Sequence, residues 1–161
     1  MLKIFDELKP FFEDCYREIS VRQYAGMIKI SPPTASKTLK NLEKNGLLLS
    51  ENKGIYIYFR ANRESFVFKQ LSKAYWFNVI NALAEKIHEI IAFKRIILFG
   101  SLIKTENSLK SDIDLYLESE PREINIKEIE KKLNRKVQLH FINSMKNENL
   151  KKNIEQGVVI R

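Results

Sequence analysis

Two acidic side chains separated by one residue, Asp112 and Asp114, are the strongest candidates for chemistry in this 161-residue sequence. They lie in an apolar run with the alternation of a β-strand, so both carboxylates are expected on one face. Upstream, an apolar run ends at Phe99 and leads into Gly100-Ser101, where a helix is expected to start. Backbone N–H groups and a hydroxyl at such a turn can hold phosphate oxygens. Paired carboxylates beside it suit a divalent cation that bridges to a nucleoside triphosphate.

This arrangement resembles the polymerase-beta-like nucleotidyltransferases, most closely their minimal, antitoxin-associated branch, and the resemblance covers residues 93–161. It implies that Gly100 and Ser101 hold the triphosphate. It also implies that Asp112 and Asp114 are catalytic and bind Mg²⁺, while a nucleoside monophosphate passes to a hydroxyl. Ser111, directly before the pair, matches a frequent serine of the family and is assigned to nucleotide binding on that basis.

Two departures from the family pattern bear on activity. The family usually places a third carboxylate on the next strand, where this chain has Gln138, which is neutral and cannot act as a base. His140 lies on the same face of that strand and is the candidate replacement. The family's minimal members commonly carry an arginine shortly after Gly-Ser, and here Lys104 is the candidate cation for nucleotide binding, without the guanidinium fork. Transfer chemistry therefore stays open beside nucleotide binding alone, or a domain kept only for partner contacts.

The elements expected to position these residues are short. Apolar patterning predicts strands over residues 95–99, 112–118 and 137–142, helices starting at 100 and spanning 127–133, and a terminal helix. Before them, residues 64–92 are predicted to form one long helix whose apolar face is too wide for a single packing partner. That width favours a homodimer or an interdomain role for this helix.

The first sixty residues have a different pattern. A helix is predicted over residues 2–19, a second from the Ser20 cap to about Ile28, and a third beginning at Ser31-Pro32-Pro33 and ending at Asn45-Gly46. Two strands are expected over residues 47–49 and 55–59, joined by a turn over 51–54.

The third helix is expected to carry a basic, exposed face. With Ala35, Leu39 and Leu42 turned to the core, polar and basic side chains point to the other side. The run of residues 28–48 resembles the recognition-helix segment of winged-helix transcriptional regulators, which implies binding of double-stranded DNA. The alternative is a winged helix used only for dimer or protein contacts. The predicted DNA-binding residues are Thr34, Ser36, Lys37, Lys40, Asn41 and Lys44, with Lys53 at the hairpin tip.

Composition limits the other possibilities. The net charge is +8, and residues 20–63 alone carry eight basic and two acidic side chains, which favours a polyanionic partner. The single cysteine, Cys15, excludes an intramolecular disulfide and a cysteine-based zinc site, and two histidines are too few for a histidine-rich metal site. Because no segment is apolar enough for a signal peptide or a membrane span, we expect a cytoplasmic protein without membrane contact.

Together these patterns predict a mixed α+β chain. We expect a winged helix-turn-helix over residues 1–62, a linking or dimerisation helix over 63–92, and a small polymerase-beta-like nucleotidyltransferase α/β domain over 93–161, with the long helix itself as an alternative boundary. Three functions compete: a regulator that binds DNA and Mg²⁺-nucleotide, a nucleotidyltransferase acting on a HEPN-type toxin or a nucleic acid, and a binding-only antitoxin that neutralises such a toxin and represses its own operon.

Overall fold

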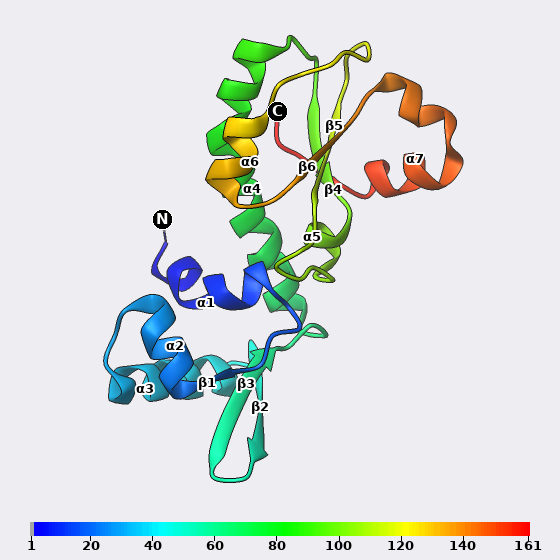
Figure 1. Ribbon diagram of the computed structural model, residues 1–161. Coiled ribbons are helices and arrows are strands. Elements are labelled where there is room, and N and C mark those ends of the chain that lie inside the picture. Colours follow the sequence, from blue (N-terminus) through cyan, green and yellow to red (C-terminus); the bar gives the residue numbers. More distant parts are fainter. Residues whose placement is uncertain (1) are drawn as a thin grey trace. The chain divides into compact units, whose positions relative to one another are not determined.

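The computed structural model describes residues 2–161, and the chain forms two compact units (Figure 1). The first unit contains the residues up to Ser72 together with Thr105–Ser108, and the second contains Lys73–Lys104 and Leu109–Arg161. The division falls inside the long helix α4 (Phe66–Ile90), so each unit takes part of that helix instead of leaving it as a separate linker.

The first unit combines three complete helices and the start of α4 with a small antiparallel sheet. Its sheet has the strand order β1-β3-β2, and α4 follows it. Side chains buried between the helices and the sheet include Phe11, Phe12, Tyr24, Leu39 and Phe59. In chain order the elements are α1 (Lys3–Glu13), β1 (Ile19–Ser20), α2 (Val21–Ile28), α3 (Pro32–Lys44), β2 (Leu48–Lys53) and β3 (Tyr56–Ala61).

Local sequence explains where α2 and α3 begin. Ser20 forms a capping box with Gln23, since the Ser20 hydroxyl accepts from the Gln23 N–H and the Gln23 side chain accepts from the Ser20 N–H. Ser31 caps α3 by accepting from the Thr34 N–H, and Pro32 occupies the first turn, where its missing N–H costs nothing. The predicted starts of both helices are confirmed.

The helix predicted over residues 2–19 is too long. α1 ends at Glu13, and Asp14 has an extended backbone. Beyond it, the Cys15 N–H donates to the carbonyl of Asn107, and Ile19 pairs with Phe59 in the sheet. The apolar side chain of Ile19 falls at helical spacing from the others, but it is buried as part of a strand.

The second unit is a four-stranded mixed sheet with the order β6-β5-β4-β7, in which only β5 and β6 are parallel. In Figure 1, α4 and α6 lie on one side of this sheet and α7 lies on the other. After α4 the elements are β4 (Ile96–Phe99), α5 (Ser101–Lys104), β5 (Ile113–Leu117), α6 (Lys127–Leu133), β6 (Val137–His140), a 3₁₀ turn η1 (Ile142–Lys146), α7 (Glu148–Glu155) and β7 (Val158–Val159).

Two details of this sheet differ from the sequence prediction. The strand expected over residues 137–142 ends at His140, because Ile142 begins the 3₁₀ turn. A final strand, Val158–Val159, follows α7 and pairs with Leu98 and Ile97. Gly157 allows this close return, since a Cβ there would collide with Ile97 and with the Leu98 carbonyl.

The wide apolar face of α4 is explained within one chain. Phe68 packs against Phe12 in the first unit, with ring centroids 5.2 Å apart. Trp76, Ile80 and Ile87 are buried in the second unit. The predicted homodimer therefore stays a prediction without support from these buried side chains. Among residues 2–161, no helix is both long and apolar enough to cross a membrane.

Candidate functional site

The Gly100-Ser101 turn is built by a fully buried strand that stops abruptly. All residues of β4 are buried, and the chain then turns through Gly100, whose φ of +79° lies in the left-handed region. A Cβ at this position would collide with the carboxylate of Asp114. Only glycine tolerates both the left-handed backbone and the close approach, and its lack of a side chain lets the turn lie directly against the carboxylate. Ser101 then opens the short helix α5.

Asp114 belongs to the central strand β5, where it lies opposite Phe99 of β4 and Gln138 of β6. Residues two apart on a strand share a face, so Asp114 is on the same face as Tyr116, which packs with Ile154 of α7. The site therefore lies on the α7 side of the sheet. Burial, and after it the negative charge of Glu118, raise the pKa of the Tyr116 phenol above its ordinary value.

Asp112 precedes the strand instead of belonging to it, because β5 begins at Ile113. The amide of Gln138 nevertheless brings it to the same site: Gln138 Nε2 donates to Asp112 Oδ2 over 2.6 Å. Since Gln138 lies beside Asp114 in the sheet, the three side chains form one cluster, which we call the aspartate cluster. The predicted closeness of Gln138 to the aspartate pair is confirmed.

His140 adds an imidazole nitrogen at the edge of the aspartate cluster. Its Nε2 lies 3.7 Å from Asp114 Oδ1, and its ring meets Phe99 edge to face. This Nε2 is buried and has no hydrogen-bond partner in the part of the chain that the structure describes. A buried nitrogen so close to a carboxylate is suitably placed to exchange a proton with a bound group.

The two remaining predicted nucleotide-binding residues are held by neighbours that the sequence did not reveal. The carbonyl of Ser111 accepts from Arg135, whose guanidinium also lies over the Trp76 ring, 5.3 Å from its centroid. Lys104 Nζ donates to Asn153 Oδ1 over 2.7 Å. Arg135 is buried, and its hydrogen bond to Ser111 fixes the backbone directly before Asp112. Nothing in its sequence context distinguishes it from other basic residues.

The oxygen ligands of the aspartate cluster suit a cation that binds together with its nucleotide. Asp112 and Asp114 offer carboxylate oxygens, and Gln138 offers an amide oxygen if its side chain rotates. Within residues 2–161, no group of three or more His, Cys, Asp or Glu side chains is placed to hold a metal ion by itself. Mg²⁺ typically uses one or two carboxylates and completes its shell with waters and substrate phosphates.

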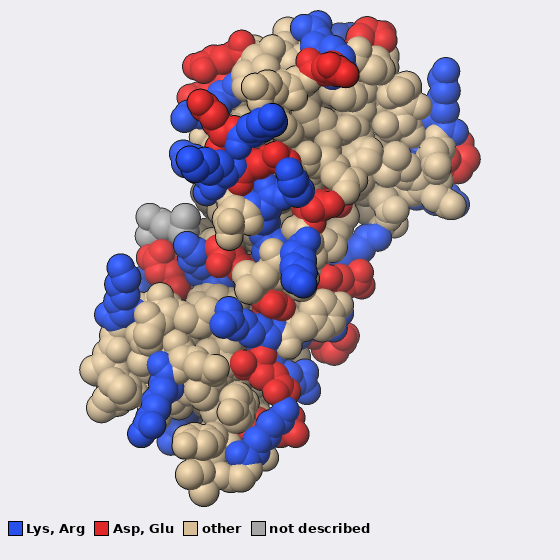
Figure 2. All heavy atoms as spheres, in the orientation of Figure 1, with Lys and Arg blue, Asp and Glu red and all other residues tan. Residues whose placement is uncertain are grey.

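The predicted orientation of α3 is confirmed. Ala35, Leu39 and Leu42 are buried, and the opposite face exposes Thr34, Lys37, Lys40, Asn41 and Lys44, with Ser36 half-buried. We call Lys37, Lys40 and Lys44, which repeat at helical spacing along that face, the lysine stripe. Figure 2 shows basic and acidic side chains interspersed over the visible surface. The lysine stripe is therefore a more specific indication of a binding face than the overall surface charge.

Lys53 differs from the lysine stripe because its charge is already compensated. Its Nζ lies 2.5 Å from Glu18 and 3.9 Å from Glu51. The hydrogen bond with Glu18 raises the pKa of Lys53. A contact between Lys53 and a phosphate would first have to compete with these two carboxylates.

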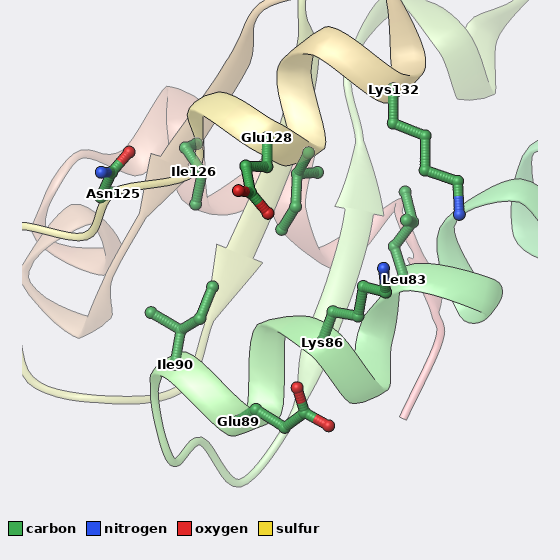
Figure 3. A pocket seen from close by; sticks show the side chains of 9 residues that line it. Leu83, Lys86, Glu89, Ile90, Asn125, Ile126, Glu128 and Lys132 are labelled. Carbon is green, nitrogen blue, oxygen red and sulfur yellow. The ribbon is translucent and has the colours of Figure 1, made fainter.

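A cavity of about 410 Å³ lies away from the aspartate cluster, between α4 and α6 (Figure 3). Its lining mixes apolar side chains with two lysines and two glutamates, and it contains no residue of the aspartate cluster or the Gly100-Ser101 turn. The lining residues are Leu83, Lys86, Glu89, Ile90, Asn125, Ile126, Glu128, Ile129 and Lys132.

Comparison with known families agrees with this geometry. The family model of the nucleotidyltransferase domain matches residues 78–160, which is just over half of the chain and contains every residue of the aspartate cluster. No curated protein and no solved structure matches the chain. The second unit thus carries the family's domain on a mixed sheet, and the chain belongs to the nucleotidyltransferase domain family.

Proposed function

We propose that the protein is a DNA-binding transcriptional regulator whose nucleotidyltransferase domain binds a Mg²⁺-nucleoside triphosphate. The observation that carries the proposed nucleotide binding is the packing of Gly100 onto the Asp114 carboxylate. This contact leaves no side chain between the turn and the carboxylates, so phosphate and cation can share one site. The DNA half is supported by the lysine stripe on an otherwise well-packed helix.

Each residue of the site has a distinct role in this proposal. Asp112 and Asp114 would hold Mg²⁺, which neutralises phosphate charge when bound. The backbone of Gly100 and the Ser101 hydroxyl would hold phosphate oxygens, and Ser111 would border them. Lys104 would contribute a positive charge after release from Asn153, its present hydrogen-bond partner.

Gln138 favours binding over rapid transfer. At the position where the family resemblance implies a third carboxylate, an amide N–H donates to Asp112. A donor in that place cannot take a proton from an attacking hydroxyl. A positioned general base typically contributes about a hundred- to ten-thousand-fold in rate, so its replacement slows transfer without preventing nucleotide binding.

The first unit supports the proposal of a winged helix. Its order is helix, short strand, two helices and a two-stranded hairpin, and the sheet has the order β1-β3-β2. α3 follows α2 after a tight turn in which Lys29 has a positive φ of 57°. In this arrangement the lysine stripe would contact DNA phosphates, while Thr34, Ser36 and Asn41 would reach base edges.

One observation favours the second candidate, an active nucleotidyltransferase. His140 places a buried nitrogen 3.7 Å from Asp114, where it could accept the proton of a hydroxyl acceptor. The acceptor would be a HEPN-type toxin or a nucleic acid. Incubation with labelled nucleotide and each acceptor class tests this function, and label transfer lost in His140→Ala would support it. A binding-only antitoxin would instead co-purify with a HEPN-type partner without modifying it.

Calorimetric titration of the full chain with ATP, GTP, CTP and UTP in the presence of Mg²⁺ tests the nucleotide half. At least one should bind, and Asp112→Asn should abolish that binding. Glu120→Gln, which removes an exposed charge in the same unit, is the matched control and should bind normally. Absence of binding to all four nucleotides would contradict the proposal.

A further inference from the structure

The segment Thr105–Ser108 belongs to one unit while its neighbours in the chain belong to the other. Directly before it, Lys104 ends α5, the helix that starts at Ser101, and shortly after it Asp112 enters the aspartate cluster. Thr105–Ser108 itself is part of the first unit. We call this segment the anchor segment. It joins the phosphate turn to the carboxylates, yet it is held by the proposed DNA-binding unit.

Asn107 is the centre of this attachment. It is fully buried, with 0% of its surface exposed. Its side-chain N–H groups donate to the carbonyls of Phe12 and Glu13 over 2.8 and 3.2 Å, and its Oδ1 lies 3.2 Å from the Cys15 sulfur. The Cys15 N–H also donates to the backbone carbonyl of Asn107. The amide therefore satisfies the carbonyls at the end of α1, which a helix leaves without partners.

A second attachment holds the beginning of the anchor segment. Arg63 Nε donates to the carbonyl of Thr105 over 2.9 Å, and the Arg63 guanidinium lies over the Tyr16 ring, 4.2 Å from its centroid. Thr105 has a positive φ of 56°, which is uncommon for a β-branched residue. A non-glycine residue keeps such a conformation only where its surroundings fix it.

We propose that Asn107 is a positioning residue for the nucleotide site, and that nucleotide occupancy is transmitted through the anchor segment to the end of α1. This inference rests on the proposed nucleotide binding. Thr105 is bonded directly to the last residue of α5, and three residues separate Ser108 from Asp112. Because a chain spans at most about 3.3–3.6 Å per residue, Asp112 can lie no more than about 14 Å from Ser108, and the phosphate turn is joined to the anchor segment without any intervening residue.

Hydrogen–deuterium exchange of the full chain tests this connection without any enzymatic readout. With Mg²⁺ and ATP, GTP, CTP or UTP in turn, a nucleotide that binds should slow exchange at residues 100–103 and 112–114. It should also change exchange at residues 12–16 and 105–108, by roughly two- to thirtyfold. Protection confined to 100–103 and 112–114 would overturn the inference and leave nucleotide binding intact. No change with any nucleotide would overturn both.

Two variants test the positioning role by affinity. Asn107→Asp keeps the size of the side chain and the acceptor near Cys15 but loses both donated hydrogen bonds. Arg63→Ala is the milder change and removes the hydrogen bond to the Thr105 carbonyl. Each should weaken Mg²⁺-nucleotide binding by roughly two- to thirtyfold. Leu109→Ala, an exposed side chain just outside the anchor segment, should leave the affinity unchanged. A purely structural role would lower the melting temperature and leave nucleotide affinity at the native value, which would overturn the inference.

Discussion

Gly100 is the residue on which the geometry of the nucleotide site depends most. It combines a left-handed backbone with a direct approach to Asp114, and two other glycines with positive φ, Gly46 and Gly54, have open space where a Cβ would be. The family's glycine is therefore required here by a contact as well as by a backbone angle.

Gly100→Ala should lose both stability and Mg²⁺-nucleotide binding. The left-handed backbone costs an L-residue about 1–2 kcal/mol, and the added methyl group would displace the Asp114 carboxylate. Gly54→Ala is the matched control, because φ is +64° there but nothing lies within 4 Å of the added Cβ. Thermal unfolding measures the stability of the two variants, and nucleotide titration measures their affinity. The affinity should fall only in Gly100→Ala. Equal effects in the two variants would mean that backbone strain alone matters.

Gln138→Asp should raise nucleotidyl transfer above the native rate. The change replaces the amide that donates to Asp112 with a carboxylate that can bind cation or accept a proton. Gln138→Ala, which removes the amide without adding a charge, separates these effects and should not increase transfer. Release of pyrophosphate with labelled nucleotide measures the rate. Brisk transfer by the native protein that Gln138→Asp leaves unchanged would instead point to His140 as the base.

At the scale of elements, α3 presents its charges with little local compensation. The lysine stripe has no ion pair within 4.0 Å among the pairs found over residues 2–161, whereas Lys53 on the hairpin is paired with Glu18. The helix is thus a better candidate for phosphate contacts than the hairpin tip.

Substituting the lysine stripe with alanine should weaken binding to duplex DNA. Each lost phosphate contact should also lower the slope of log affinity against log salt by about one unit. The triple variant of Lys127, Lys131 and Lys132 removes the same charge from α6 and controls for net charge. Fluorescence anisotropy across a salt series measures both quantities. Similar losses in the two triple variants would indicate non-specific charge effects.

The elements differ in how far they could be predicted. The helix over residues 127–133 and the starts of α2 and α3 were predicted correctly, because caps and apolar spacing act within a few residues. The end of α1 and the strand β7 were not, because each is fixed by distant partners: Asn107 for Cys15, and β4 for Val158. The position of Gln138 on the strand beside the aspartates follows from the family pattern, whereas its hydrogen bond with Asp112 does not. Asn107 and Arg135 left no local signal, because their partners are distant in the sequence.

At the scale of the molecule, the chain passes between its two units three times, at residues 72–73, 104–105 and 108–109. The last two passages flank the anchor segment. If the proposed nucleotide and DNA sites influence each other through these passages, thermodynamic linkage requires the influence to be reciprocal.

If the proposed nucleotide and DNA sites are linked, Mg²⁺-nucleotide should change duplex DNA affinity by the same factor by which DNA changes nucleotide affinity. Typical coupling corresponds to roughly 5–150-fold. Anisotropy titrations with and without nucleotide, and the converse calorimetric titration with and without DNA, measure the two factors. Nucleotide binding that leaves DNA affinity unaltered would show independent sites.

Binding of Mn²⁺, followed by electron paramagnetic resonance as a substitute for Mg²⁺, tests the central claim most directly. The aspartate cluster offers two carboxylates and one amide, so the full chain should hold Mn²⁺ tightly only when a nucleoside triphosphate is also present. Asp112→Asn should abolish the nucleotide-dependent signal, and Glu120→Gln should preserve it. Mn²⁺ binding that does not depend on nucleotide, or that survives Asp112→Asn, would contradict a shared metal and phosphate site at Gly100 and the aspartate cluster.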